Sequence, residues 1–157
     1  MATSQDKYQV GRALTVIPSD TIDIINPASG VISSSATGTT ANKLVDTTQT
    51  FTNTIHSGDI IRNNTDDTLA TVVGIDDANT LSLSADIMAS GEDYVLYKKS
   101  GSRGAVLYVG VAGDVAVETI GGDQVVYLDI AAGSWMPVKV NKVLATGTTA
   151  ISILAQW

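Results

Sequence analysis

The single histidine of the chain, His56, is the first residue whose type could support catalysis or metal binding. A catalytic histidine needs a positioned partner, such as an orienting carboxylate or a nucleophile, and no specific partner stands near it in the sequence. A zinc site needs several ligands drawn from Cys, His and carboxylates, and the chain has no Cys. We therefore interpret His56 as a solvent-facing loop residue and expect no metal site.

Two pairs of adjacent aspartates, Asp66-Asp67 and Asp76-Asp77, could offer oxygen ligands to calcium. The calcium loop of alternating Asp residues with a Gly and a terminal Glu is absent, however. A glycosidase would need two carboxylates that face each other across a cleft, whereas these aspartates fall in turn-like segments. We favour solvated turn carboxylates, and we expect no catalytic residue, no cofactor and no enzymatic activity.

Two glycine-rich segments, residues 101–104 (GSRG) and 110–113 (GVAG), fit neither phosphate-loop pattern, and no helix is expected after them. The aromatic residues lie mostly in or beside predicted strands, with few cations between them. That pattern is typical of core and interface packing and not of a platform for stacking bases. Four aromatic residues are our candidates for a subunit interface: Trp135, Trp157, Tyr108 and Tyr127.

The composition is that of a folded protein without nucleic-acid or membrane partners. The 157 residues can form one domain or two small ones, 44% of them are hydrophobic, and 16% are charged. The net charge of −7 argues against nucleic-acid binding, which needs clustered cations. The apolar runs are far shorter than the roughly 20 residues that cross a bilayer. Because the N-terminus lacks the apolar core of a signal peptide, we expect synthesis in a cytoplasm.

Period-two alternation recurs along the chain and helical periodicity does not, which predicts an all-β fold. The C-terminal part is expected to form strands over residues 105–111, 114–119, 124–130, 135–144 and 150–157. The short link Ala112-Gly113 predicts a hairpin between the first two of these strands. Gly121-Gly122-Asp123 predicts the turn after the second strand.

The middle of the chain has a different character. Residues 31–51 are dense in Ser, Thr and Ala with weak patterning. Beyond them we expect strands over 59–63, 69–75, 80–84 and 94–98, turns at 64–67 and 76–79, and a short helical turn at 86–90. Residues 31–99 carry nine carboxylates and four cations, which is −5 of the total net charge. The segment has its own strand set and charge balance, with Ser-Gly at both borders, and so is expected to form a separate small module.

We therefore expect a β-sandwich, jelly-roll-like base domain built from residues 8–30 plus 101–157, with a small β-barrel-like module, residues 31–100, inserted in it. A long excursion at a loop is tolerated, because closing a longer loop adds only modest entropy. The hexapeptide ATGTTA occurs at both 36–41 and 145–150. Its flanks do not match, so convergence on a simple turn sequence is the favoured interpretation.

Two blocks of the sequence resemble a known family. The first is residues 12–21 (RALTVIPSDT), and the second begins at 103–114 (RGAVLYVGVAGD) and continues through Pro137-Val138-Lys139-Val140 to 145–150. Together they resemble the head-spike base and capsid decoration proteins of tailed phages and gene transfer agents, in which the two blocks lie close together. Here about eighty residues separate them, and most of these residues form the segment 31–100, which resembles modules that recur in phage virion proteins.

The resemblance implies a virion structural protein that decorates the capsid as a cement protein, or forms a head-spike or fibre base. It also implies a homotrimer or homopentamer, with the major capsid protein or a head fibre as partner, located in the virion. A tail-fibre, baseplate or neck adaptor is an alternative. A carbohydrate-binding module is a further one, with Trp135, Tyr127 or Tyr108 stacking on sugars.

Overall fold

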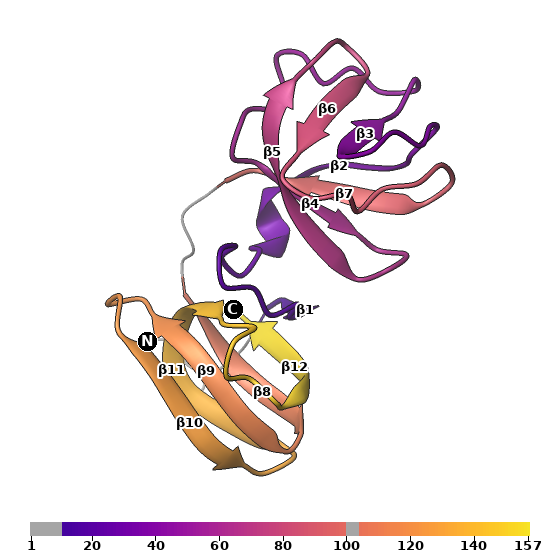
Figure 1. Cartoon of the computed structure of the whole chain (residues 1–157). Coiled ribbons are helices and arrows are strands. Elements are labelled where there is room, and N and C mark those ends of the chain that lie inside the picture. Colours follow the sequence, from indigo (N-terminus) through magenta and orange to yellow (C-terminus); the bar gives the residue numbers. More distant parts are fainter. Residues whose placement is uncertain (1–10, 100–103) are drawn as a thin grey trace. The chain divides into compact units, whose positions relative to one another are not determined.

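The structure, a computed structural model, describes residues 11–99 and 104–157. The chain divides into two compact units, Met1–Pro27 with Ser102–Trp157, which we call the base, and Ala28–Gly101, which we call the insert (Figure 1). Residues 8–10 of the predicted base domain, and the predicted border Ser100-Gly101, lie outside the described residues. Within the described residues, no helix is long and apolar enough to span a membrane.

The base contains one antiparallel sheet with the strand order β1-β12-β8-β11-β9-β10. Its strands are β1 (Ala13–Thr15), β8 (Ala105–Val111), β9 (Gly113–Thr119), β10 (Gln124–Ile130), β11 (Ser134–Val143) and β12 (Ile151–Gln156). The bounds of β8 and β10 are those predicted, and those of β9, β11 and β12 differ by one residue at one or both ends. The all-β class predicted from period-two alternation is confirmed.

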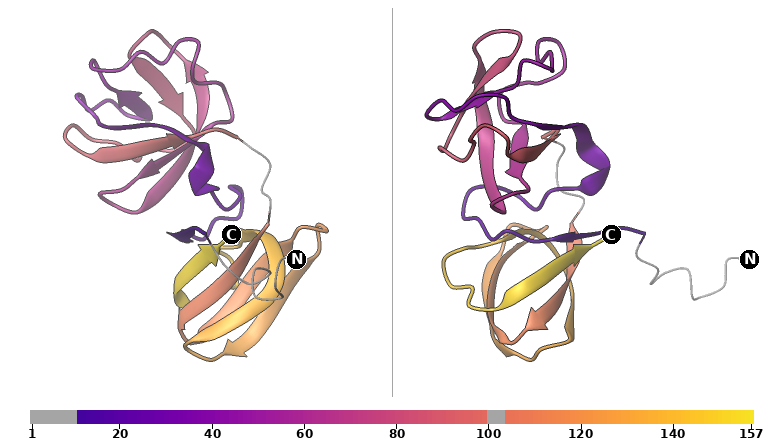
Figure 2. Two further views of the ribbon diagram at one scale, coloured as in Figure 1. Left: turned by 180° about the vertical axis from the view of Figure 1, so that it is seen from behind. Right: turned by 90° about the vertical axis from the view of Figure 1, so that its right-hand side faces the viewer.

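Alternation along the strands builds the core of the base. In β8, Leu107 and Val109 are fully buried while Tyr108 between them is only partly buried. Their inward neighbours on β9, β11 and β12 include Val117, Val140 and Ile153. The sheet bends around this core, an arrangement consistent with the predicted β-sandwich (Figure 2). Each large apolar side chain buried in this way contributes about 1.5–3 kcal/mol.

The predicted hairpin between β8 and β9 is wrong. Strand β8 pairs with β11 and β12, whereas β9 pairs with β10 and β11. Both run antiparallel to β11, so they run in the same direction and cannot form a hairpin. The link at Ala112-Gly113 therefore bends the chain without reversing its direction. A Cβ at Gly113 would lie 2.5 Å from the backbone nitrogen of Ala150, so only glycine permits this close approach.

The insert contains a second antiparallel sheet, with the order β2-β7-β4-β5-β6-β3. Its strands are β2 (Gly30–Ser35), β3 (Lys43–Val45), β4 (Ile60–Asn63), β5 (Thr68–Ile75), β6 (Thr80–Leu83) and β7 (Asp93–Tyr97), preceded by the 3-10 turn η2 (Pro27–Ser29). The predicted turns at 64–67 and 76–79 connect the hairpins β4–β5 and β5–β6, as expected. Strands β2 and β3 fall in the Ser/Thr-rich stretch, where no strand was predicted.

The two end strands of the insert sheet are linked at one point. An isolated bridge joins Gly38, just beyond β2, to Val45 of β3, and the Thr37 N–H donates to the Val45 carbonyl at 2.8 Å. Closure of the predicted barrel-like module thus extends to one bridge and is not a continuous ladder. The insert has its own core, which includes Leu44, Phe51, Ile61, Tyr94 and Leu96.

The predicted helical turn at residues 86–90 is wrong, because no helix forms there. Met88 is buried and Ile87 packs on the same core, while the Ala89 N–H donates to Glu92 Oε2 at 2.6 Å. Packing of the adjacent Ile87 and Met88 on the core therefore outweighs the local turn preference of this segment.

The two copies of ATGTTA adopt different structures. Gly147 has a φ of 89° in a turn, whereas Gly38 forms the bridge to β3. In the second copy, Thr148 and Thr149 accept backbone hydrogen bonds from Ala116 and Asp114. This difference fits convergence of a simple sequence better than an internal repeat.

Candidate functional site

His56 lies exposed in a loop of the insert. The backbone N–H of His56 donates to Asp59 Oδ2 at 3.0 Å, and the ring Nδ1 lies 3.3 Å from Lys98 Nζ. Lys98 also forms an ion pair with Asp59 at 3.0 Å. The buried Asp59 carboxylate thus holds the loop and the end of β7 together, which is a structural arrangement and not a nucleophile beside a base.

The paired aspartates do not form a ligand cluster. Asp66, Asp67, Asp76 and Asp77 are exposed in the two hairpin turns. Asp67 pairs with Arg62 and Asp76 pairs with Lys43. In the described parts of the chain, no group of three or more His, Cys, Asp or Glu side chains could hold a metal ion.

Asp46 is the most buried carboxylate of the insert, with none of its surface exposed. Burial raises its pKa, but hydrogen bonds from Thr48 and Tyr94 outweigh that effect, and the net pKa lies below the usual value. The Tyr94 hydroxyl donates to Asp46 Oδ2 at 2.7 Å. Burial, and then this hydrogen bond to the carboxylate, raises the pKa of Tyr94 far above its ordinary value. Such a satisfied buried pair fixes the packing of a core.

Two of the four predicted interface residues come together on the outer face of the base sheet. Trp135 of β11 lies directly opposite Tyr108 of β8. Their ring centroids are 5.8 Å apart and their planes meet at 71°, an edge-to-face pair. Tyr108 also lies opposite Leu154 of β12. Trp135 remains 54% exposed. These three residues lie side by side on the outer face, and we call them the outward apolar row.

The other two predicted interface residues belong to the core of the base. Tyr127 of β10 and Trp157, just after β12, are partly buried and pack against the core cluster. Tyr127 lies opposite Val115 on the inner face. Neither residue joins Trp135 and Tyr108 on the outer face, so the structure divides the predicted set in two.

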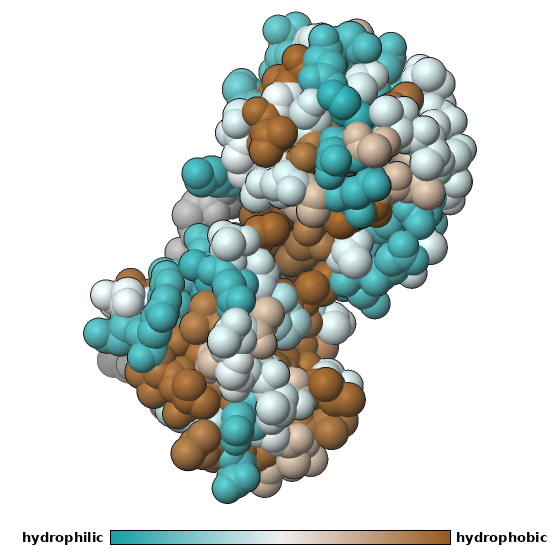
Figure 3. All heavy atoms as spheres, in the orientation of Figure 1, coloured by the Kyte–Doolittle hydropathy of each residue, from teal (hydrophilic) through white to brown (hydrophobic). Residues whose placement is uncertain are grey.

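Sequence reasoning predicted strand β10 but missed that it forms an exposed apolar edge of the sheet. Among the described strands it pairs with β9 alone and ends the strand order, yet it exposes Val125, Val126 and Leu128 by 40%, 50% and 69%. Figure 3 shows hydrophobic side chains gathered over this part of the base. The signal was present in the sequence QVVYLDI, in which apolar residues occupy both faces of a strand where a half-buried strand would alternate with polar ones.

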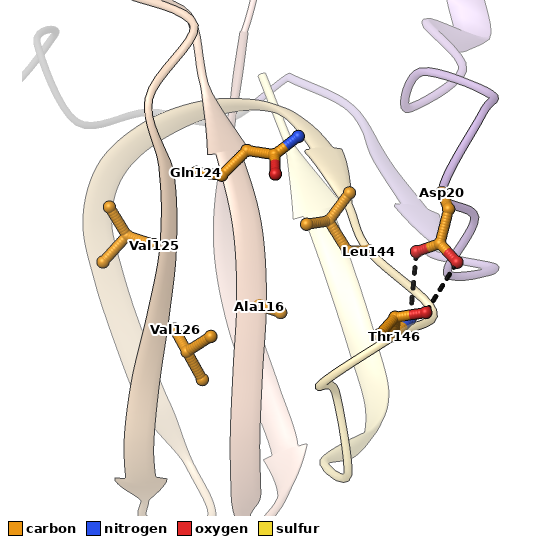
Figure 4. A pocket seen from close by; sticks show the side chains of 7 residues that line it. All are labelled: Asp20, Ala116, Gln124, Val125, Val126, Leu144 and Thr146. Atoms are coloured by element: carbon orange, nitrogen blue, oxygen red, sulfur yellow. Dashed lines mark hydrogen bonds between the residues drawn. The ribbon is translucent and has the colours of Figure 1, made fainter.

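A groove of about 370 Å³ lies on the outer face beside β10. Val126 and Leu144 flank the small side chain of Ala116, with Gln124 above them (Figure 4). Val126 lies opposite Ala116 in the ladder. The far side of the groove is Asp20, whose carboxylate accepts hydrogen bonds from the Thr146 N–H at 2.9 Å and hydroxyl at 2.8 Å. These two bonds lower the pKa of Asp20, so the groove has an anionic wall.

Comparison of the chain with protein-family models, with curated proteins and with solved structures gave no match to any of the three. The described surface therefore has to be interpreted from its own residues.

Proposed function

We propose that the protein is a structural component of a tailed-phage particle, which decorates the capsid or anchors a head spike or fibre as a symmetric homo-oligomer. The observation that carries this proposal is the outward apolar row of Trp135, Tyr108 and Leu154 on the base sheet. An indole with 54% of its surface exposed, held in place by an aromatic neighbour, is a suitable anchor for a protein interface.

The placement of the two family-like blocks supports the same proposal. Residues 12–21 contain β1, the second block contains β8, and both strands belong to the base sheet. Blocks far apart in the sequence thus contribute to one sheet of the base, and the acidic segment between them forms the insert. The proteins that the two blocks resemble sit on the capsid and anchor a projecting fibre.

Native mass spectrometry of the purified protein tests the oligomer, since the chain mass is 16.3 kDa. We expect a trimer or a pentamer for the wild type and monomers for Trp135→Gln, which removes the exposed anchor. Val73→Gln is the matched control, because Val73 is 53% exposed on the insert. It should leave the oligomer intact. A wild type that stays monomeric at all concentrations would contradict the homo-oligomer.

Position in the particle needs a separate experiment. We expect the protein in gradient-purified virions, with immunogold label on the head. Label on the tail would instead assign a tail-fibre, baseplate or neck adaptor, and absence from purified particles would refute a virion role altogether.

Trp135 also favours a second candidate, a carbohydrate-binding module, because an exposed indole can stack on a sugar ring. A glycan array gives the direct comparison. Binding that disappears in Trp135→Gln, together with a monomeric wild type, would replace the structural proposal. An array without hits would remove this candidate.

A further inference from the structure

The free edge of β10 carries information beyond its exposed side chains, because the ladder shows which backbone groups point outward. The Thr119 N–H donates to the Asp123 carbonyl at 2.9 Å, so this pair is hydrogen-bonded. Bonded and non-bonded pairs alternate along an antiparallel ladder. The bonded residues of β10 are therefore Val125 and Tyr127, and the N–H and C=O groups of Gln124 and Val126 point away from β9.

The partner residue on β9 agrees with this assignment. Ala116 lies opposite Val126, and it directs its own backbone groups away from β10. Its N–H donates to Thr148 Oγ1 at 3.0 Å, and its carbonyl accepts from the Leu144 N–H at 2.8 Å. Within residues 11–99 and 104–157, no hydrogen bond reaches the outward groups of Gln124 and Val126. As far as the described residues go, the edge is thus open over this stretch.

Beyond Tyr127 the edge is shaped differently. The register of β10 shifts between Tyr127 and Ile130, and Asp129 has a φ of 52°. Its N–H donates to Asp114 Oδ1 at 2.9 Å. Such a bulge interrupts strand pairing and is a common way to limit an edge. Only the first half of β10 can therefore accept another strand, and that half borders the groove of Val126, Ala116 and Leu144.

The charges next to the open stretch select its partner. Asp123 precedes the strand and Asp129 follows the open half, and both are exposed. Glu118 lies opposite Gln124, and Lys142, the cation beside it, already contacts Glu118 and Asp23 at 3.4 and 3.6 Å. These carboxylates attract a cationic partner and repel an anionic one.

A second copy of the chain fits poorly on the edge. Antiparallel self-pairing over the open stretch would bring the exposed Asp123 and Asp129 of one copy close to those of the other, and like charges repel each other across an interface. The occupant that suits the site has apolar side chains in the middle and Lys or Arg at its ends.

We infer that the Gln124–Val126 edge of β10 and its groove bind an extended segment of another protein by strand addition, with β-branched or small apolar residues flanked by cations. Main-chain hydrogen bonds would supply the affinity, and the groove would take an alternate side chain of the added strand. This inference deepens the proposed structural function by naming the kind of segment through which a partner attaches. It concerns a different surface from the outward apolar row at Trp135.

Fluorescence anisotropy with labelled synthetic peptides tests the inference on the full-length protein. The probe is Lys-Thr-Val-Thr-Val-Thr-Lys, and its controls are the same peptide with Glu at both ends and the same peptide with N-methylated valines. We expect the Lys-ended peptide to bind, and the other two to bind at least about tenfold more weakly. Equal binding of all three peptides would overturn strand addition.

Two variants locate the site. Val126→Pro removes an outward N–H that takes no part in the β9 ladder, so the edge strand should tolerate the substitution. The variant should no longer bind the Lys-ended peptide. Val126→Thr keeps the N–H and should bind within about threefold of the wild type. The double change Asp123→Asn with Asp129→Asn should weaken binding of the Lys-ended peptide by about threefold to tenfold. Unchanged binding by a folded Val126→Pro variant would overturn the site. The N-methylated peptide tests the same main-chain hydrogen bonds without any substitution in the protein.

The outcomes also separate this inference from the proposed function. A wild-type oligomer that Val126→Pro dissociates, with no peptide binding, would assign the edge to a second copy and refute a foreign segment. Peptide binding by a protein absent from purified virions would refute the virion role and leave the strand-addition site standing. If the protein is present in purified virions but binds none of the peptides, the strand-addition site is refuted and the virion role stands.

Discussion

At the scale of single residues, the buried Tyr94–Asp46 pair is the most sensitive polar contact of the insert. Tyr94→Phe removes the hydroxyl that donates to Asp46 at 2.7 Å and leaves a fully buried carboxylate with one donor fewer. Because hydrogen bonds to charged groups are stronger than neutral ones, we expect a loss of about 1.5–3 kcal/mol in the free energy of unfolding of the insert, measured by urea denaturation.

Tyr108→Phe is the matched control for that change. Tyr108 makes its contacts through the ring, against Trp135, and it lies on the surface of the base. The same chemical deletion there should alter stability by less than about 0.5 kcal/mol. Equal effects of the two substitutions would show that the buried hydrogen bond contributes no more to the free energy of unfolding than an exposed hydroxyl does.

The same scale sets the acid response of the insert. Asp59 is buried, which raises its pKa, but the backbone N–H groups of Lys99 and His56 and the Lys98 ammonium lower it below the usual value. The pKa of Asp46 is also lowered. A carboxyl with a depressed folded pKa stabilises the fold above its unfolded pKa, near about 4, and loses that contribution as pH falls through the folded pKa.

We therefore expect the insert to lose stability as pH falls below about 4, and Asp59→Asn to flatten this dependence. Asp66 acts with the opposite sign, because a hydrogen bond and repulsion from Glu92 raise its pKa, so its contribution falls as pH rises. Urea denaturation at several pH values, with Asp77→Asn as an exposed control, makes the measurement. An Asp59→Asn curve parallel to that of the wild type would contradict the assignment.

At the scale of elements, the approach of β8 to β12 depends on one glycine. A Cβ at Gly110 would lie 2.8 Å from the Ser152 carbonyl oxygen and 2.9 Å from its Cβ, and Ser152 itself has a φ of 56°. The contact is with backbone, which cannot swing aside. Gly110→Ala should thus destabilise the base by about 1–3 kcal/mol, as overpacking does elsewhere.

Gly74→Ala in β5 tests whether this effect comes from the contact or from the loss of a strand glycine. The nearest atom to a Cβ at Gly74 is Ser82 Cβ at 3.8 Å, an ordinary contact. We expect little change in thermal stability, or a small gain, since alanine restricts the unfolded chain more than glycine. A loss at Gly74 as large as that at Gly110 would mean that steric contact does not explain either result.

The strands whose bounds the sequence predicted well are runs of apolar, mostly β-branched and aromatic residues with glycine-containing links at both ends, such as β8 and β10. Strand β2 was missed because its outward and inward positions both carry Ser next to Val31 and Ile32, so no period emerges. The β8–β9 hairpin was mispredicted because a Gly-containing link looks the same whether it reverses the chain or bends it. Pairing partners depend on β11, which follows later in the sequence.

The candidate site was predictable in part for a similar reason. Aromatic type and strand placement led to Trp135 and Tyr108, which the register brings together. Tyr127 has the same type and the same strand setting, but its side chain points to the core because it lies opposite Val115. Only pairing with a second strand decides which face a residue occupies, and sequence alternation in β10 was too weak to reveal it.

At the scale of the whole molecule, each unit has its own sheet and its own core, and these two cores share no residue. Since unfolding cooperativity follows shared burial, we expect calorimetry to resolve two transitions, one for each unit. Tyr94→Phe should lower only the transition of the insert, and Gly110→Ala only that of the base. In the double variant each transition should shift by as much as it does in the corresponding single variant, because the two sites share no partners. A single transition that both substitutions lower equally would instead mean that the two units fold as one cooperative body, and a strand bound at β10 should then stabilise the insert as well as the base.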